Sequence, residues 1–265
     1  MADHYNRPPF ITDDPICIPH RFSKQQDVEI AGFIVAMLAW GRRQTIISKA
    51  SEFIELMEGE PYRFVMEHSE EDRKAFLNFK HRTFQPTDAL YFLAFLQHHY
   101  QNNKSLESAF TGGGTLQSVD VGPALIRFHK TFFSLPWAPE RTKKHVATPE
   151  RGSSCKRLNM FLRWMVRNDK SGVDLGVWKE IHPRQLLMPL DVHVGRVARR
   201  LGLLNRKASD WKAVLELTEA VRILDKEDPV RYDFALFGSG VLENQESNLS
   251  STIRNAPSED GVGLR

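Results

Sequence analysis

Residues 152–204 read GSSCKRLNMFLRWMVRNDKSGVDLGVWKEIHPRQLLMPLDVHVGRVARRLGLL, and the predicted fold is built outward from them. The first part is helical in pattern, because its apolar residues recur three and four positions apart and share one face. These residues are Leu158, Phe161, Leu162, Met165 and Val166. Ser153 and Ser154 precede this helix as candidate N-caps. The opposite side, with Lys156, Asn159, Arg163 and Arg167, is predicted to be a cationic face.

The last part of the stretch predicts a second helix. Pro189 disfavours a helix running straight into it, and Asp191 then stands where an N-cap residue belongs. A second apolar stripe follows, formed by Val194, Val197, Ala198 and Leu201. Gly202 fits a helix C-terminus. A lysine, Lys156, therefore opens one basic helix, and an aspartate opens the next.

The segment from Pro189 to Gly202, PLDVHVGRVARRLG, resembles the catalytic-aspartate segment of the helix-hairpin-helix DNA glycosylases. Members of that superfamily share an (I/V)-Asp-(T/V)-His-(V/I/M)-x-Arg signature at the start of a helix. By this resemblance Lys156 corresponds to the family's Schiff-base lysine and Asp191 to its catalytic aspartate. The lysine-to-aspartate spacing is nearest to the archaeal 8-oxoguanine DNA glycosylase branch. The whole chain also resembles a bacterial family carried only as a conserved hypothetical protein.

Two other segments resemble the same superfamily. FIVAMLAWGRRQTIISKAS, residues 33–51, is similar to its first helix-turn-helix, which faces the DNA and the extruded base; Gly41 stands where endonuclease III has a glutamine. Pro149–Lys156 lies where the family has its phosphate-binding hairpin, with one glycine of the usual two. The resemblance implies DNA contacts from Gly152, Ser153, Ser154, Arg157, Arg163, Arg196, Arg42 and Arg43. It implies a base pocket of Trp40, Gln44 and Trp164.

The implied architecture is all-α, with two lobes around a cleft and a helix-hairpin-helix-like element. Residues 1–243 are expected to form one unit. Its extended N-terminal arm, residues 1–20, and the C-terminal helices belong to one lobe, and the middle helices to the other. Residues 244–265 hold no aromatic residue and are rich in Ser, Asn and Gly, so a disordered tail is expected there.

Composition limits the classes of function. The net charge is only +3, but nine Lys and Arg lie between residues 141 and 170 against two acids, Glu150 and Asp169. Such a block favours a polyanionic partner, and the alternative is a solvated basic face. Two cysteines cannot build a four-cysteine zinc or iron–sulfur site, so no metal and no cofactor are expected. No apolar run approaches a membrane span of ~20 residues, so a cytoplasmic protein is expected.

The predicted activity is base-excision repair by a DNA glycosylase and AP lyase that removes a damaged base, with an oxidised purine as the suggested lesion. Asp191 would stabilise positive charge on the sugar, and Lys156 would form a covalent imine with it. The expected partner is duplex DNA holding a damaged base, bound by a monomer without a membrane. His193 is expected to be structural and turned away from Asp191.

Three alternatives stay open at this level. Asp191 could act only as a helix cap while Lys156 contacts a phosphate. The chain could be a non-catalytic DNA-binding protein of the same fold. A metal-dependent hydrolase would need a paired-histidine motif, and neither HxxxH nor HExxH occurs among the ten histidines.

Overall fold

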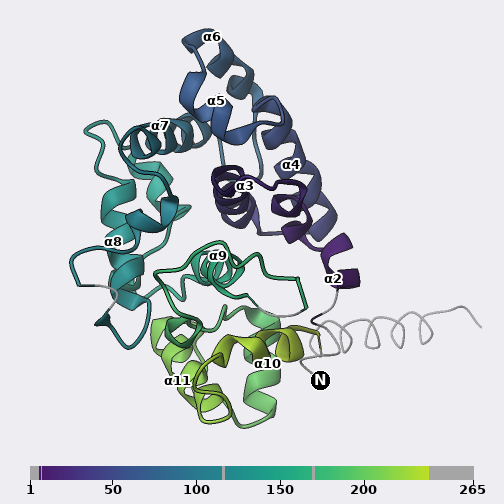
Figure 1. The fold of residues 1–265 in the computed structure, drawn as a ribbon. Helices are drawn as coiled ribbons and strands as arrows, with labels where there is room; N and C mark the ends of the chain where they lie inside the picture. The colour runs from purple at the N-terminus through teal and green to yellow at the C-terminus, as the bar shows by residue number, and fades with distance from the viewer. Residues whose placement is uncertain (1–5, 7, 115–116, 169–170, 239–265) are drawn as a thin grey trace, which may run out of the picture.

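The computed structural model describes residues 6, 8–114, 117–168 and 171–238, and their regular elements are all helical (Figure 1). The only extended pairings in these ranges are isolated bridges, His81 with Phe84 and Ser153 with Asp210. The predicted all-α fold class is therefore confirmed. The predicted disordered tail, residues 244–265, lies outside the described part of the chain. The division of residues 1–243 into two lobes around a cleft stays a prediction.

The molecule is arranged around two helices that pack on each other, α3 (Gln25–Leu38) and α9 (Lys156–Val166). Proline begins α5 and α7, because its fixed φ suits a first helical position where no amide donor is needed. The other α-helices are α2 (Pro8–Thr12), α4 (Arg43–Leu56), α5 (Pro61–Glu67), α6 (Glu70–Arg73), α7 (Pro86–Asn102), α8 (Gly122–Phe132), α10 (Val192–Arg200) and α11 (Trp211–Arg222). Short 3-10 turns connect several of them, and residues 233–238 form a further helical segment.

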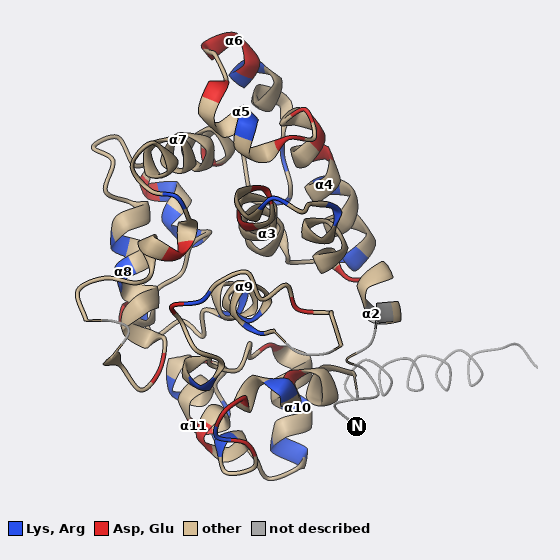
Figure 2. Cartoon of the chain, viewed as in Figure 1, with Lys and Arg blue, Asp and Glu red and all other residues tan. Residues whose placement is uncertain are grey.

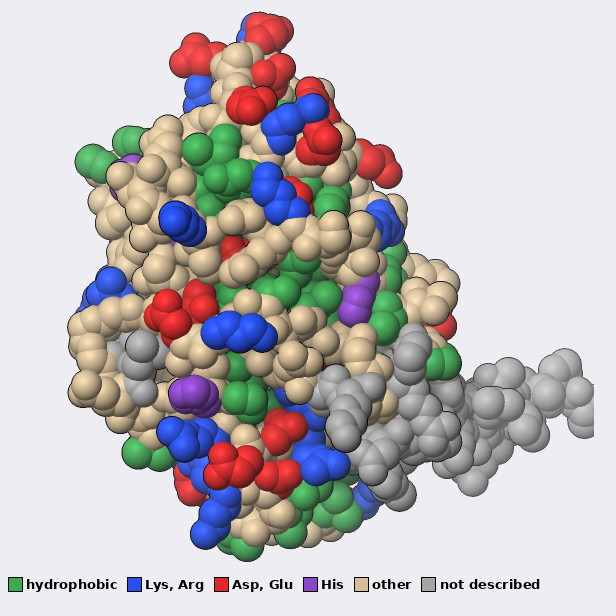
Figure 3. Space-filling model, in the orientation of Figure 1, with side chains coloured by type: hydrophobic (Ala, Val, Ile, Leu, Met, Phe, Trp, Pro, Cys, Tyr) green, Lys and Arg blue, Asp and Glu red, His purple; other side chains and the backbone are tan. Residues whose placement is uncertain are grey.

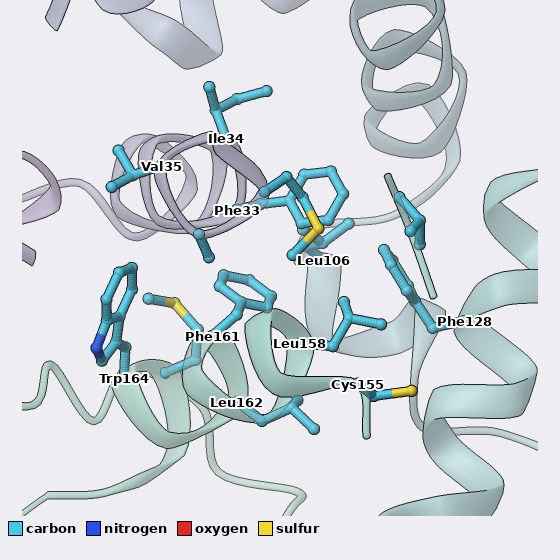
Figure 4. Close-up of a cluster of buried hydrophobic side chains, with 14 of the residues drawn as sticks. Phe33, Ile34, Val35, Leu106, Phe128, Cys155, Leu158, Phe161, Leu162 and Trp164 are labelled. Carbon is cyan, nitrogen blue, oxygen red and sulfur yellow. The ribbon is translucent and has the colours of Figure 1, made fainter. Parts of the chain in front are cut away.

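Aromatic side chains hold the two central helices together. Phe33 of α3 lies 5.7 Å from Phe161 of α9, and it also contacts Phe128 of α8 at 5.5 Å, measured between ring centroids (Figure 4). These edge-on arrangements are favoured by the quadrupoles of the rings. Each such side chain removes a large apolar area from water. The phenylalanines of the middle region are therefore mostly core.

The helix α9 is buried on both sides, so the predicted cationic face is wrong. Asn159, Arg163 and Arg167 are 1%, 5% and 4% exposed. The apolar stripe was correctly located, but other parts of the chain cover the opposite side as well. The two guanidiniums are accommodated there because buried carboxylates pair with them.

The chain before α3 also differs from expectation. Residues 8–21 form the short helix α2 and two 3-10 turns, Pro15–Cys17 and Pro19–Arg21, instead of an extended arm. The prolines cause this, because each one begins a helical turn. None of the helices in the described ranges combines the length and the apolar character that crossing a bilayer requires.

Candidate active site

Lys156 and Asp191 come together although they are far apart in sequence. Lys156 is the first residue of α9, and Asp191 is the N-cap of α10. The lysine Nζ lies 3.9 Å from Asp191 Oδ2, and the side chains are 28% and 20% exposed. In Figure 1, α9 lies near the middle of the molecule and α10 lies below it, toward the lower end. An amine and a carboxylate thus meet at a partly buried position that a ligand can still reach.

Asp191 holds this position because it caps its helix, as predicted. Its Oδ1 accepts a hydrogen bond from the Val194 amide at 2.9 Å, which satisfies a free donor of the first turn. The other oxygen, Oδ2, is the atom turned toward Lys156. The Asp191 carboxylate therefore caps the helix with Oδ1, and its Oδ2 still faces Lys156.

The backbone before Lys156 adopts an unusual path. Cys155 is the N-cap residue of α9 and has left-handed φ of 49°, so the predicted caps Ser153 and Ser154 are wrong. Ser153 instead accepts a hydrogen bond from the Cys155 amide at 3.2 Å. Gly152 also has positive φ, 71°, and its carbonyl accepts from the Trp211 amide at 3.0 Å. This contact fixes the turn against the start of α11.

A cavity of about 590 Å³ opens beside Lys156 and Asp191. Its apolar and aromatic wall comes from Pro15, Ala39, Trp40, Gly41, Ile46, Met160, Trp164, Pro189, Val192 and Phe237. Its ionisable wall comes from Asp14, Arg43, Lys156, Arg157, Arg163, Asp191, His193 and Asp233. This volume is typical of pockets that bind small organic groups. The elements that build it span the chain from residue 14 to residue 237.

Trp40 and Trp164 both line the cavity, whereas the third predicted pocket residue does not. Trp40 is half-buried and is held by Arg157, whose guanidinium lies 4.9 Å from its ring, and by His81 at 4.8 Å. Trp164 is 1% exposed, and its indole N–H has no hydrogen-bond partner among the described residues. Gln44 is exposed on α4 and is not part of the cavity wall, because the helix turns it outward.

The residues predicted to bind DNA differ in their exposure. Arg42 and Arg196 are exposed, and Gly152 is exposed in its turn. Arg163 is instead buried in ion pairs with Asp174 and Asp233, so it is unavailable to DNA.

Two more of these arginines face the cavity. Arg157 donates to the carbonyls of Met37 and His145 and supports Trp40, which makes it a structural residue of the wall. Arg43 lines the cavity with its guanidinium 5.5 Å from the Phe237 ring.

The charged side chains do not form one continuous basic stripe. In Figure 2 the blue Lys and Arg segments are spread over several helices, with acidic segments between them. Figure 3 shows positive and negative side chains interspersed on the same face, with hydrophobic side chains visible between them. On the face shown in these views, no long run of basic side chains offers a polyanion a continuous contact.

A buried ion-pair network lies against the cavity and was not predicted. Arg163 pairs with Asp174 at 3.2 Å and with Asp233, and Arg167 pairs with Asp174 at 3.0 Å and with Asp228 at 2.8 Å. Two cations thus face three carboxylates. Burial raises the pKa of Asp233 to about 6 although Arg163 opposes the shift, and the charge of Asp191 adds to it.

The cavity is expected to lose one negative charge as the pH falls through about 6, when Asp233 takes up a proton. A polyanion such as a DNA duplex, if bound at this cavity, should therefore bind about fivefold more tightly on acidification, as expected for one nearby charge. Fluorescence anisotropy at pH 7.5 and pH 5.5 measures this for the wild type and Asp233→Asn. Because His193 also lines the cavity, the two proteins are compared at each pH. A pH response of the same size in Asp233→Asn would contradict the assignment.

Two further ionisable residues of the cavity wall, His193 and Asp14, were not predicted to belong to the site. His193, expected to be structural, is half-buried and lines the same cavity as Asp191. Asp14 also lines it; burial raises its pKa, although its side chain accepts from the Ile16 amide at 3.1 Å. An Asp-Pro pair at residues 14–15 signals a turn, but nothing local to it indicates the cavity.

Comparison with known families identifies the chain. The model of the family described as "Protein of unknown function (DUF2400)" matches residues 14–242. The chain belongs to this family. No curated protein and no solved structure matches it.

The family match corrects the assignment made from sequence. Residues 14–242 match DUF2400, and nothing in the comparisons shows the helix-hairpin-helix DNA glycosylases, so that family assignment was wrong. The matched range covers both helix starts of the site, and the family shown is one of unknown function. The short PLDVHVGRVARRLG similarity falls at the start of one helix and describes a local pattern.

No cluster of three or more His, Cys, Asp or Glu side chains in the described ranges is arranged to hold a metal ion. The carboxylates Asp14, Asp191 and Asp233 line the same cavity, but each has contacts within the protein. Both cysteines, Cys17 and Cys155, are free thiols.

Proposed function

We propose that the protein is a DNA N-glycosylase with AP lyase activity that removes a damaged base. The observation that carries the proposal is the Lys156–Asp191 pair, 3.9 Å apart beside a cavity with an aromatic wall. Removal of a base with strand cleavage needs a nucleophilic amine, a carboxylate near the sugar and a space for the base. The three features occur together here, and the proposal rests on this combination and not on family membership.

Each residue has a defined task in the proposed reaction. As the bond from C1′ to the base breaks, the base leaves with the electron pair, and the Asp191 carboxylate stabilises the positive charge on the sugar. The neutral Lys156 amine bonds to C1′, and the proton that its nitrogen loses goes to the departing base. The sugar ring then opens as its oxygen takes up a proton from water, which leaves a protonated imine between Lys156 and C1′. Loss of a proton from C2′ expels the 3′ phosphate and nicks the strand.

The cavity suits an extruded base. A base inside a duplex cannot reach Lys156, so the nucleotide must rotate out of the stack into the protein. The half-buried Trp40 offers the face of its indole ring. Phe237, which comes late in the chain, also lines the cavity. Aromatic side chains stack on bases, and such contacts would hold the base while the sugar reacts.

The proposal includes DNA as partner and the cytoplasm as location. Arg42, Arg196 and Gly152 are exposed near the elements that line the cavity, and they would contact phosphates. The free thiols of Cys17 and Cys155 agree with a reducing compartment. A single copy of the chain supplies every residue of the proposed reaction, so a monomer is the proposed active form.

Borohydride trapping tests the proposal directly. The protein is mixed with duplexes that carry 8-oxoguanine, an oxidised pyrimidine, uracil or an abasic site, and the imine is reduced to a stable adduct. A covalent protein–DNA adduct is expected, and the duplex that gives most adduct names the class of lesion. DNA binding without an adduct on any duplex would favour a non-catalytic DNA-binding protein. Absence of both binding and adduct would overturn the proposal.

A further inference from the structure

A tight turn at residues 81–84 presents an arginine in a strained conformation. His81 and Phe84 exchange two backbone hydrogen bonds, with N–O distances of 3.0 and 2.9 Å. Arg82, within this turn, has φ of 54°, in the left-handed region that a side chain with a Cβ rarely adopts. Its side chain is exposed. Glycine or asparagine would fit this backbone with less strain, so the arginine side chain needs a reason to be there.

The turn is docked on a segment that lines the cavity. The His81 ring packs edge-on against Trp40 at 4.8 Å, and its Nε2 lies 3.3 Å from the Trp40 carbonyl oxygen. Next to Trp40, Gly41 has φ of 110°, and a Cβ there would lie 2.6 Å from Arg82 Nη1. The Arg82 guanidinium thus occupies the space that a side chain at position 41 would need. Both Trp40 and Gly41 line the cavity.

Arg82 differs from the arginines that the fold uses internally. The guanidiniums of Arg157, Arg163 and Arg167 donate to carbonyls or carboxylates of the protein. Within the described ranges, the Arg82 side chain makes no ion pair. The one side chain there that hydrogen-bonds to Arg82 is Gln85, whose Nε2 donates to the Arg82 carbonyl oxygen at 3.2 Å. The guanidinium is therefore available beside the cavity, with nothing in the described fold neutralising it.

We infer that Arg82 binds a phosphate of the DNA strand whose nucleotide enters the cavity. A guanidinium matches the geometry of phosphate oxygens and donates two parallel hydrogen bonds to them. The turn fixes the position of the Arg82 backbone. Because Gly41 has no side chain, the Arg82 guanidinium can lie close to the cavity. This inference rests on the proposed function. It adds a DNA contact from a segment that the sequence motifs do not include.

The test measures binding to a labelled duplex with a tetrahydrofuran abasic analogue, which cannot form an imine. Dissociation constants are determined by anisotropy over a range of NaCl concentrations. Arg82→Ala should bind about tenfold more weakly, and the slope of log K against log salt should fall by about one. Arg82→Lys should recover the slope and part of the affinity. Arg73→Ala serves as the matched control, because Arg73 lies on α6, far from α9 and α10 (Figure 1).

A further variant separates loss of contact from loss of fold. Arg82→Asn tolerates the left-handed backbone, so it should melt at or above the temperature of the wild type while binding as weakly as Arg82→Ala. Arg82→Ala with wild-type affinity and slope would overturn the inference, as would a loss of affinity with an unchanged slope. If the wild type itself bound no duplex, the proposed function would fall too. Wild-type binding and trapping with an unaffected Arg82→Ala would refute only the role of Arg82.

Discussion

A Lys156→Ala variant is expected to give no borohydride adduct and to lose strand nicking by at least about a thousandfold, while it still binds DNA. Lys156 is the only lysine in the cavity wall that the structure describes, so no second amine lies ready to replace it. The side chain is 28% exposed, and alanine is a good helix former, so the stability should change by less than ~0.5 kcal/mol. Gel analysis of nicked duplex and the trapped adduct measure the effect.

The control for this variant is Lys144→Ala, which removes an exposed lysine from the same basic region of the sequence. It should trap and nick like the wild type. Lys156→Arg retains the charge but cannot form an imine at neutral pH, so it should bind DNA at least as well as Lys156→Ala and give no adduct. Undiminished nicking by Lys156→Ala would show that the amine of this lysine is not the nucleophile.

An Asp191→Asn variant is expected to lose base excision by about a hundred- to a thousandfold without losing stability. Asparagine caps a helix about as well as aspartate, so the bond from the Val194 amide, 2.9 Å in the wild type, should remain. The negative charge facing Lys156 would be gone, and the developing positive charge on the sugar would have no partner. Single-turnover assays of base release together with thermal melting separate the two effects.

Two other substitutions distinguish a catalytic carboxylate from a simple cap. Asp191→Ala removes both functions, so it should lose ~1 kcal/mol of stability as well as activity. Asp210→Asn is the matched control, because Asp210 caps α11 through the Ala213 amide at 3.1 Å and is not in the cavity wall. It should leave base release unchanged. Wild-type rates for Asp191→Asn would mean that Asp191 serves only as a cap.

Much of the local structure could be predicted from sequence. The apolar spacing in residues 158–166 located α9, because one buried face imposes a helical period on the chain. Asp191 was predicted as an N-cap and is one, since capping depends on neighbouring amides only. The meeting of Lys156 and Asp191 was expected from motif order, and the structure places the two side chains together.

The environment of the arginines could not be predicted in this way. Periodicity shows which face of α9 is apolar, but it does not show that the other face is also covered. Arg163 is buried because Asp174 and Asp233 approach it from segments that follow α9 in the chain. Asp233 and Asp14 were missed for the same reason, since their place in the cavity depends on tertiary packing. The caps before α9 were misread because Cys155 adopts a left-handed backbone.

The cavity wall contains residues from positions 14 to 237, and this has a consequence for how the protein is made. During synthesis on the ribosome the N-terminal residues of the cavity wall emerge first. The wall cannot be completed until Asp233 and Phe237 have also emerged. Pairings over such long sequence separations form late and slow the folding of a domain. We therefore expect nascent chains that end before residue 233 to lack the complete cavity even where α3 and α9 have already packed together.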